Sequence, residues 1–391
     1  MTSTSTLYPR RPIKPKRDKQ HQHPFEDQDR DQDQPRRQWD FRLSTVVSPP
    51  AAPHAISDAL GTIEFDPTRR VLATAGIARK IRIFNVSSML QDHEEIDGQT
   101  RFLDQGACCE FYICTPAKLS SVRFRPEAAG RVIGAGDYDG VVTEYDLEKR
   151  VAVFERDEHG GRRVWSLAYS HCAPTLCASG SDDGTAQLWD TRAGVATCAG
   201  VVRPGERGEA VCSVEFEPGG GHGVGVGCAD RGAYVYDARA VGAGPVVALR
   251  GHGRAVTYVR FVGDDKVVTS AADGSHRLWA AAEGKEVRVY RGHENGRSFV
   301  GMEVWRGGGL IGSGSESDEV YVYDLRWGEP VWVEGFGSQG GFVSCVSWRE
   351  EDEGGGEEGV LVAGGTDGVV KLFQGRRKGV DEEEIVEQWE G

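Results

Sequence analysis

Seven times along this chain, an aromatic residue stands six positions after a turn position. The pairs are Ala78–Phe84, Asp139–Tyr145, Asp183–Trp189, Asp230–Tyr236, Asp273–Trp279, Ser317–Tyr323 and Asp367–Phe373. Most pairs follow one another at roughly 40–45 residues, the period of a repeat that forms one four-stranded blade. Each unit also opens with an apolar, alternating segment: 60–65, 119–124, 164–169, 211–216, 256–261, 300–304 and 343–348. Because one blade cannot bury both its faces alone, seven units predict a closed ring.

The clearest unit spans Leu176 to Arg192. A small-residue segment, Cys177–Gly180, is followed by an Asp-Asp-Gly turn and a segment that ends in Trp189-Asp190, as is typical of a WD repeat. The sequence therefore predicts an all-β, seven-bladed WD40 β-propeller over residues 39–376. Arg42–Val47 alternates like a strand, and we expect it to close the ring against the last blade.

The segments outside this repeat are polar. Residues 1–38 are predicted to form a disordered N-terminal segment and residues 377–391 an acidic C-terminal tail. The insertion around residues 87–107 and the acidic, Gly-rich stretch 350–359 are predicted to be surface loops. A basic cluster, Arg10-Arg11 with Lys14, Lys16 and Arg17, is either a nuclear import signal or a solvated tail.

Composition narrows the functional classes. The net charge of −14 argues against a general nucleic-acid binder. The nine cysteines lack metal-ligand spacing, and no apolar run approaches the ~20 residues that span a bilayer. We therefore expect reduced thiols, no metal or cofactor, no membrane segment, and a protein of the nucleus and cytosol.

Two units contain a His, a hydroxyl residue, an Asp and a Trp at matching positions. These sets are His159, Ser179, Asp183 and Trp189 in the third unit, and His252, Thr269, Asp273 and Trp279 in the fifth. They could be mistaken for a catalytic His/Ser/Asp arrangement. Repetition at the same spacing indicates a buried, structural hydrogen-bonded chain instead, so we predict a protein that is not an enzyme.

One face of the ring is where the units differ most. The residue before each opening segment should lie at the mouth of the axial channel, and these residues are Ala59, Lys118, Arg163, Ala210, Ala255, Phe299 and Phe342. The next channel-facing position is small in most units but is Trp165 in the third. The residue before the turn position points to the same face, and in the second unit it is Tyr138.

Lys118, Tyr138, Arg163 and Trp165 are therefore expected to converge, with Phe299 across the mouth. Aromatic walls beside cations suit an extended peptide with an apolar anchor and acidic neighbours. The alternative is that Trp165 only plugs the channel and that the two cations are solvated.

Several motifs also carry a family resemblance: Ile63-Glu-Phe-Asp66, Asp137-Tyr-Asp-Gly140, Val164-Trp-Ser166, Phe299-Val-Gly301 and Glu319-Val-Tyr-Val-Tyr323. Over about residues 39–375 the chain resembles the propeller of the plant constitutive-photomorphogenesis ubiquitin ligase and its suppressor-of-phytochrome partners. A stand-alone propeller that opens with Trp39-Asp-Phe-Arg-Leu-Ser is similar to the plant repressors of UV-B photomorphogenesis.

This resemblance implies a function. Members of that family bind the UV-B photoreceptor and return its active monomer to the inactive homodimer. In the related ligase, Val-Pro peptides with nearby acidic residues bind at positions that match Lys118, Tyr138, Arg163, Trp165 and Phe299. Near the start of blade 5 the ligase has a Lys where this chain has Gly253-Arg254. We therefore include Arg254 among the predicted peptide-binding residues, and we expect its positive charge to lie at a different place from that of the Lys.

A second resemblance concerns Asp190 and Arg192. Trp189-Asp-Thr-Arg192 is similar to the box by which propellers dock on the DNA-damage-binding adaptor of cullin-4 ubiquitin ligases. The alternative is an ordinary strand end, in which the Asp caps the turn and the Arg pairs locally. The other function to consider is thus a cullin-4 substrate receptor for photomorphogenesis transcription regulators.

Overall fold

The computed structural model describes residues 38–50, 57–90, 99–192, 198–263, 265–338, 340–350 and 357–378. The basic cluster from Arg10 to Arg17 and nearly all of the acidic tail lie outside the described residues. Gln38, which was assigned to the N-terminal segment, is described. Its carbonyl accepts a hydrogen bond from the amide of Lys378 at 2.7 Å, so the chain ends of the described propeller lie side by side.

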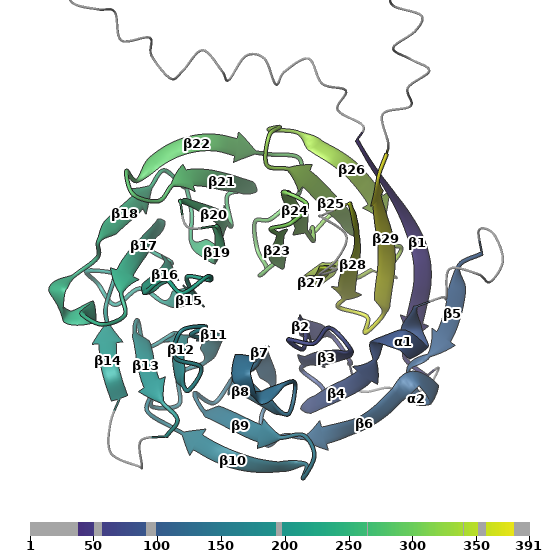
Figure 1. The fold of residues 1–391 in the computed structure, drawn as a ribbon, viewed down its shortest axis with the longest axis horizontal. Helices are drawn as coiled ribbons and strands as arrows, with labels where there is room; N and C mark the ends of the chain where they lie inside the picture. The colour runs from purple at the N-terminus through teal and green to yellow at the C-terminus, as the bar shows by residue number, and fades with distance from the viewer. Residues whose placement is uncertain are drawn as a thin grey trace, which may run out of the picture. The chain divides into compact units, whose positions relative to one another are not determined.

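Seven sheets form a ring in which each blade starts at the axis and ends at the rim (Figure 1). Blade 1 contains β2 (Leu60–Phe65), β3 (Val71–Gly76), β4 (Lys80–Asn85) and β6 (Cys109–Cys114). Blades 2 and 3 contain β7 (Leu119–Phe124), β8 (Val132–Asp137), β9 (Val142–Asp146) and β10 (Val151–Arg156), then β11 (Val164–Tyr169), β12 (Leu176–Ser181), β13 (Ala186–Asp190) and β14 (Cys198–Val202).

The remaining blades follow in chain order. Blade 4 contains β15 (Val211–Phe216), β16 (Gly223–Cys228), β17 (Gly232–Asp237) and β18 (Val247–Arg250), and blade 5 contains β19 (Val256–Val262), β20 (Lys266–Ala271), β21 (Ser275–Ala280) and β22 (Lys285–Tyr290). Blade 6 contains β23 (Met302–Trp305), β24 (Leu310–Ser313), β25 (Glu319–Asp324) and β26 (Pro330–Gly335), and blade 7 contains β27 (Val343–Glu350), β28 (Glu358–Gly365) and β29 (Val370–Arg377). The seven-bladed propeller predicted from the repeat is confirmed.

Helices are short: α1 (Val86–Met89), α2 (Gln105–Cys108) and the 3-10 turns η3 (Pro126–Ala128) and η4 (Val241–Ala243). Within the described part of the chain, no helix has the length and apolar character needed to cross a membrane.

The ring is closed by the strand predicted for that role. β1 (Trp39–Ser48) pairs antiparallel with β29, from Trp39 opposite Arg377 to Val47 opposite Val370. In Figure 1, β1 lies beside β29 although the two strands come from opposite ends of the propeller sequence. The prediction for Arg42–Val47 is confirmed, and the strand is longer than predicted at both ends.

The insertion after β4 is not only a surface loop, and that prediction is wrong for part of it. Arg101–Asp104 forms β5, which pairs in parallel with Thr45–Ser48 of β1 and makes blade 7 five-stranded. The main-chain groups at this edge of β1 are thereby paired rather than left exposed.

Blade 6 also departs from prediction, because β23 begins at Met302 rather than Val300. The amide of Gly301 donates to the carbonyl of Ser344 in blade 7 at 3.0 Å. A Cβ on Gly301 would lie only 2.6 Å from the Cα of Cys345, so only glycine permits this approach between blades.

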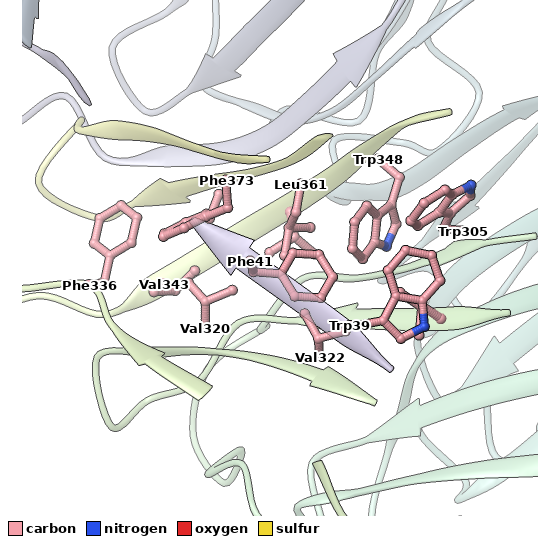
Figure 2. Close-up of a cluster of buried hydrophobic side chains, with 13 residues drawn as sticks. Trp39, Phe41, Trp305, Val320, Val322, Phe336, Val343, Trp348, Leu361 and Phe373 are labelled. Carbon is pink, nitrogen blue, oxygen red and sulfur yellow. The ribbon is translucent and has the colours of Figure 1, made fainter. Parts of the chain in front are cut away.

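The apolar core where the ring closes combines aromatic and aliphatic side chains (Figure 2). Trp39 packs edge-on against Trp305 with ring centroids 5.0 Å apart, and Trp305 lies 5.3 Å from Trp348. Phe41 occupies the space that a side chain at residue 375 would need, since a Cβ on Gly375 would lie 2.2 Å from its ring. Burial of these rings from blade 6, blade 7 and its closing strand β1 stabilises the closed ring.

Candidate functional site

A cavity of about 400 Å³ opens at the mouth of the axial channel. Residues at the start of the opening strands and before the turns line its entrance: Ile77, Tyr138, Trp165, Phe299, Phe342 and Thr366. At these positions the side chain differs from one blade to the next. The cavity is therefore lined by residues that the repeat does not dictate.

A repeated main-chain hydrogen bond explains why these side chains meet. In six blades the amide of the residue before the turn donates to the carbonyl of the residue before the opening strand. This bond joins Tyr138 to Lys118 at 2.9 Å and Asp182 to Arg163 at 3.0 Å. It fixes the two positions of each blade side by side, whatever side chains they carry.

Arg163 is held by aromatic rings from two blades. Its guanidinium carbon lies 3.9 Å from the centre of the Tyr138 ring and 4.4 Å from that of Trp165. Such cation–π contacts contribute roughly 0.5–1 kcal/mol each where water has access. The guanidinium nitrogens of Arg163 make no hydrogen bond or ion pair within the described residues, and Nε is buried without a partner. The side chain as a whole is half-buried, so its charge is not neutralised by the protein and could attract a carboxylate.

Trp165 and Phe299 meet across the mouth, from blades 3 and 6. Their rings stack with centroids 4.0 Å apart at an interplanar angle of 13°. The indole Nε1 of Trp165 donates to Asp182 Oδ1 at 2.5 Å, which fixes the ring orientation. The stack covers part of the channel, as the plug alternative required, and it also presents an apolar surface next to Arg163.

The loop that carries Phe299 is pinned from both sides. Oε1 of Glu316 accepts hydrogen bonds from the amides of Arg297 and Ser298 at 2.7 and 2.6 Å. Burial alone would raise the pKa of Glu316, but these amide donors outweigh it and hold the pKa below its ordinary value. On the other side, Arg254 donates to the carbonyl of Gly296 at 2.8 Å.

The structure thus brings Tyr138, Arg163, Trp165 and Phe299 into direct contact. Lys118 is exposed and adjoins Tyr138 through the main chain, outside the cavity lining. Arg254 is exposed as well, lies outside the lining, and contacts the loop before Phe299 rather than the cation–π cluster.

A charged network deeper in the channel was missed by the sequence reasoning. Arg260 lies 2.9 Å from Glu303 and 3.0 Å from Glu215, and Arg123 contacts Glu64. Arg123, Arg260 and Glu303 line both the mouth cavity and a second cavity, of about 360 Å³, toward the other end of the channel. The two cavities therefore meet at these ion pairs. The sequence does contain a signal for this network. In four opening strands a charged residue stands directly before the last aromatic residue: Glu64, Arg123, Glu215 and Arg260.

Within this network, one carboxyl group is strongly perturbed. Burial raises the pKa of Glu64 to about 7, and the attraction of Arg123 offsets only part of that effect. In contrast, the guanidinium groups of Arg260, Arg123 and Arg306 outweigh the burial of Glu303 and hold its pKa below the ordinary value.

The His, hydroxyl, Asp and Trp sets form buried hydrogen-bonded chains. In blade 3, His159 contacts Asp183 at 2.8 Å and Ser179 at 2.7 Å, and Trp189 donates to Ser179 at 2.8 Å. The set of blade 5 repeats this pattern. His252 contacts Asp273 at 3.1 Å and Thr269 at 2.7 Å, and Trp279 donates to Thr269 at 2.8 Å. Among the described residues, no three His, Cys, Asp or Glu side chains are arranged to hold a metal ion.

Asp190 and Arg192 form a local ion pair at the end of β13. The Arg192 guanidinium donates to both carboxylate oxygens, at 3.1 and 2.9 Å, and this bonding lowers the pKa of Asp190 to about 2. The same arrangement occurs between Asp237 and Arg239 at the end of β17. The side chain of Arg192 is 72% exposed, so it is paired and still accessible to a partner.

Comparison with known proteins gives a consistent set of relatives. The WD domain, G-beta repeat, family matches residues 149–190 and 244–280. WD repeat-containing protein RUP2 of Arabidopsis thaliana is 54% identical over 332 residues, which cover 82% of this chain and 89% of that protein. RUP1 of the same plant is 53% identical over 351 residues, covering 88% and 86%. The E3 ubiquitin-protein ligase COP1 of Arabidopsis thaliana is 31% identical over 305 residues, which cover 75% of this chain and 42% of the ligase.

Proposed function

Because the chain belongs to the RUP family of WD repeat-containing proteins, we propose that it is a non-enzymatic repressor of UV-B light signalling that binds the UV-B photoreceptor. The observation that carries the proposal is the cluster of Tyr138, Arg163, Trp165 and Phe299 at the channel mouth. Such a cluster joins apolar rings to a cation that has no hydrogen-bond or ion-pair partner within the described residues.

The ligand that fits this surface is an extended peptide of the Val-Pro type with acidic neighbours. The Val-Pro pair would pack on the rings of Tyr138 and Trp165, and a proline enters such a contact with little conformational entropy to lose. An acidic neighbour would pair with Arg163 or Lys118. The net charge of −14 repels acidic ligands at long range, so these local cations determine where the peptide binds.

The repression itself requires binding energy rather than chemistry. The protein must bind a dimerisation-competent state of the receptor more tightly than the free active monomer, because only differential affinity shifts an equilibrium. While it holds the Val-Pro peptide, it would also exclude the related photomorphogenesis ubiquitin ligase from the same peptide. We place this activity in the nucleus and cytosol.

The test is the rate at which UV-B-activated receptor returns to its dimer. Wild-type protein is expected to accelerate that return, and the double variant Lys118→Ala with Trp165→Ala is expected to lose the acceleration. The matched control is Lys149→Ala with Tyr112→Ala, an exposed lysine and an exposed aromatic residue on the outer part of the ring. If the first double variant accelerates the return as well as wild type, the assignment of this face is wrong.

A second proposal is docking to the DNA-damage-binding adaptor of cullin-4 ligases, which would make the protein a substrate receptor for transcription regulators. It is supported by the exposure of Arg192 beside Asp190. Arg239 provides a matched control, because it pairs with Asp237 in the same geometry one blade later. Loss of adaptor binding in Arg192→Ala but not in Arg239→Ala would support this role. Absence of adaptor binding by wild-type protein would remove it.

A further inference from the structure

A groove of about 730 Å³ lies between blades 7 and 1, on the face opposite the channel mouth. Ala59 and Ile77, at one end of the first hairpin of blade 1, line the mouth, whereas Arg69 and Arg70, in the turn at its other end, line the groove. The groove and the candidate peptide site are therefore separate surfaces.

The charge of this groove contrasts with that of the whole protein. Five arginines line it, against two carboxylates, in a chain whose net charge is −14: Arg42, Arg69, Arg70, Arg349 and Arg376 against Asp40 and Glu358. The Arg42 and Arg70 side chains are exposed and make no hydrogen bond or ion pair within the part of the chain that the structure describes. Arg376 pairs with Glu358 at 3.2 Å, so the unneutralised charge is that of Arg42 and Arg70, and these two cations favour an acidic ligand.

The floor of the groove adds an apolar component. Val86 of α1 and Val360 of β28 lie there but are almost fully buried, and Leu90, which follows α1, is the partly exposed apolar residue. The matching ligand is thus an acidic segment that also carries apolar side chains. A small inorganic anion would leave this floor unused.

We propose that the occupant is the C-terminal segment of the same chain, residues 379–391. Its sequence, GVDEEEIVEQWEG, contains six carboxylate side chains, no basic residue, and the apolar residues Val380, Ile385, Val386 and Trp389. The segment follows Lys378, directly after β29, whose residues Gln374–Arg376 line the groove. Thirteen extended residues reach at most about 45 Å, so a segment that follows Lys378 is long enough to extend along the groove.

Tethering makes a weak contact sufficient. A segment attached by a short linker is present at an effective concentration of roughly 1 mM, so a dissociation constant of about 100 μM for the free peptide would leave the tethered segment about 90% docked. The same arithmetic predicts that the docked tail weakens the binding of a free copy of the peptide by about tenfold.

The experiment measures binding of a fluorescent synthetic peptide, residues 379–391, by anisotropy at low and high salt. We expect the peptide to bind the propeller lacking residues 379–391 about tenfold more tightly than the full-length protein. Arg42→Glu with Arg70→Glu, in the shortened chain, is expected to weaken binding at least tenfold. Arg203→Glu with Arg207→Glu, at two exposed arginines outside the groove, is the matched charge control and should leave binding within twofold.

Three results would overturn the proposal. These are equal affinity for the shortened and full-length proteins, equal loss with the Arg203→Glu, Arg207→Glu control and with the groove variant, or undiminished binding of a peptide whose carboxylates are replaced by amides. Since the groove is separate from the mouth, Trp165→Ala should leave this binding unchanged, so failure here is distinguishable from failure of the receptor proposal.

Discussion

Arg163 gives the sharpest test of the mouth surface, because its side chain combines two separable properties. It contributes a charge, and it contributes a planar group that lies against the rings of Tyr138 and Trp165 at 3.9 and 4.4 Å. Arg163→Ala removes both properties. Arg163→Lys keeps the charge and loses the planar group with its donor edge.

The expected magnitudes follow from these contacts. A hydrogen bond to a charged group contributes about 1.5–3 kcal/mol, and partial access of water at the mouth favours the lower end of that range. We therefore expect Arg163→Ala to weaken a Val-Pro peptide with acidic neighbours by about tenfold, since 1.4 kcal/mol corresponds to a factor of ten. Arg163→Lys should weaken it by about threefold.

The assay is titration calorimetry with that peptide, with thermal unfolding of each variant as the check on folding. Arg162→Ala is the matched control, because this exposed neighbour carries the same charge and its side chain makes, within the described residues, a single hydrogen bond, to the carbonyl of Asp182 at 3.4 Å. If Arg162→Ala and Arg163→Ala weaken the peptide equally, binding depends on the overall charge and the reasoning from geometry is refuted.

Two further predictions concern the scaffold and the channel. Ser179→Ala leaves the buried ring nitrogen of His159 and the indole N–H of Trp189 without a partner. We therefore expect the free energy of unfolding, measured with urea, to fall by about 2–4 kcal/mol. A fall below about 1 kcal/mol would contradict the structural role of this hydrogen-bonded chain. The pKa of Glu64 is raised to about 7 from an ordinary value of 4.5, so the folded state binds the proton more tightly and stability should fall as pH rises from 5 to 8, by at most about 3 kcal/mol. Glu64→Gln should flatten that slope, and an unchanged slope would show that another group is responsible.

The repeat predicted the fold because the same position recurs in every blade. An aromatic residue at the end of each third strand, from Phe84 to Phe373, is buried in all seven blades. Comparison of blades also predicted which side chains meet at the mouth, because one main-chain hydrogen bond fixes the paired positions in most of them. Register in a repeat is therefore enough to place residues such as Tyr138 and Arg163.

Contacts outside that register could not be predicted in the same way. The four residues of β5 pair with β1, a strand more than fifty residues earlier, and no local pattern marks that pairing. The ion pairs of Arg123 and Arg260 join different blades, so they depend on the width of the channel rather than on the repeat. For Asp190 and Arg192, a spacing of two residues fits both a docking box and a local ion pair, and only the geometry reveals the local pair.

The central claim is that the mouth of the channel binds the Val-Pro peptide of the UV-B photoreceptor. The most direct measurement is whether purified protein and UV-B-activated receptor co-elute on a sizing column, with and without an excess of free Val-Pro peptide. We predict a complex that the peptide displaces and that Trp165→Ala with Lys118→Ala does not form. A complex that persists in excess peptide, or the absence of any complex with wild-type protein, would contradict the account.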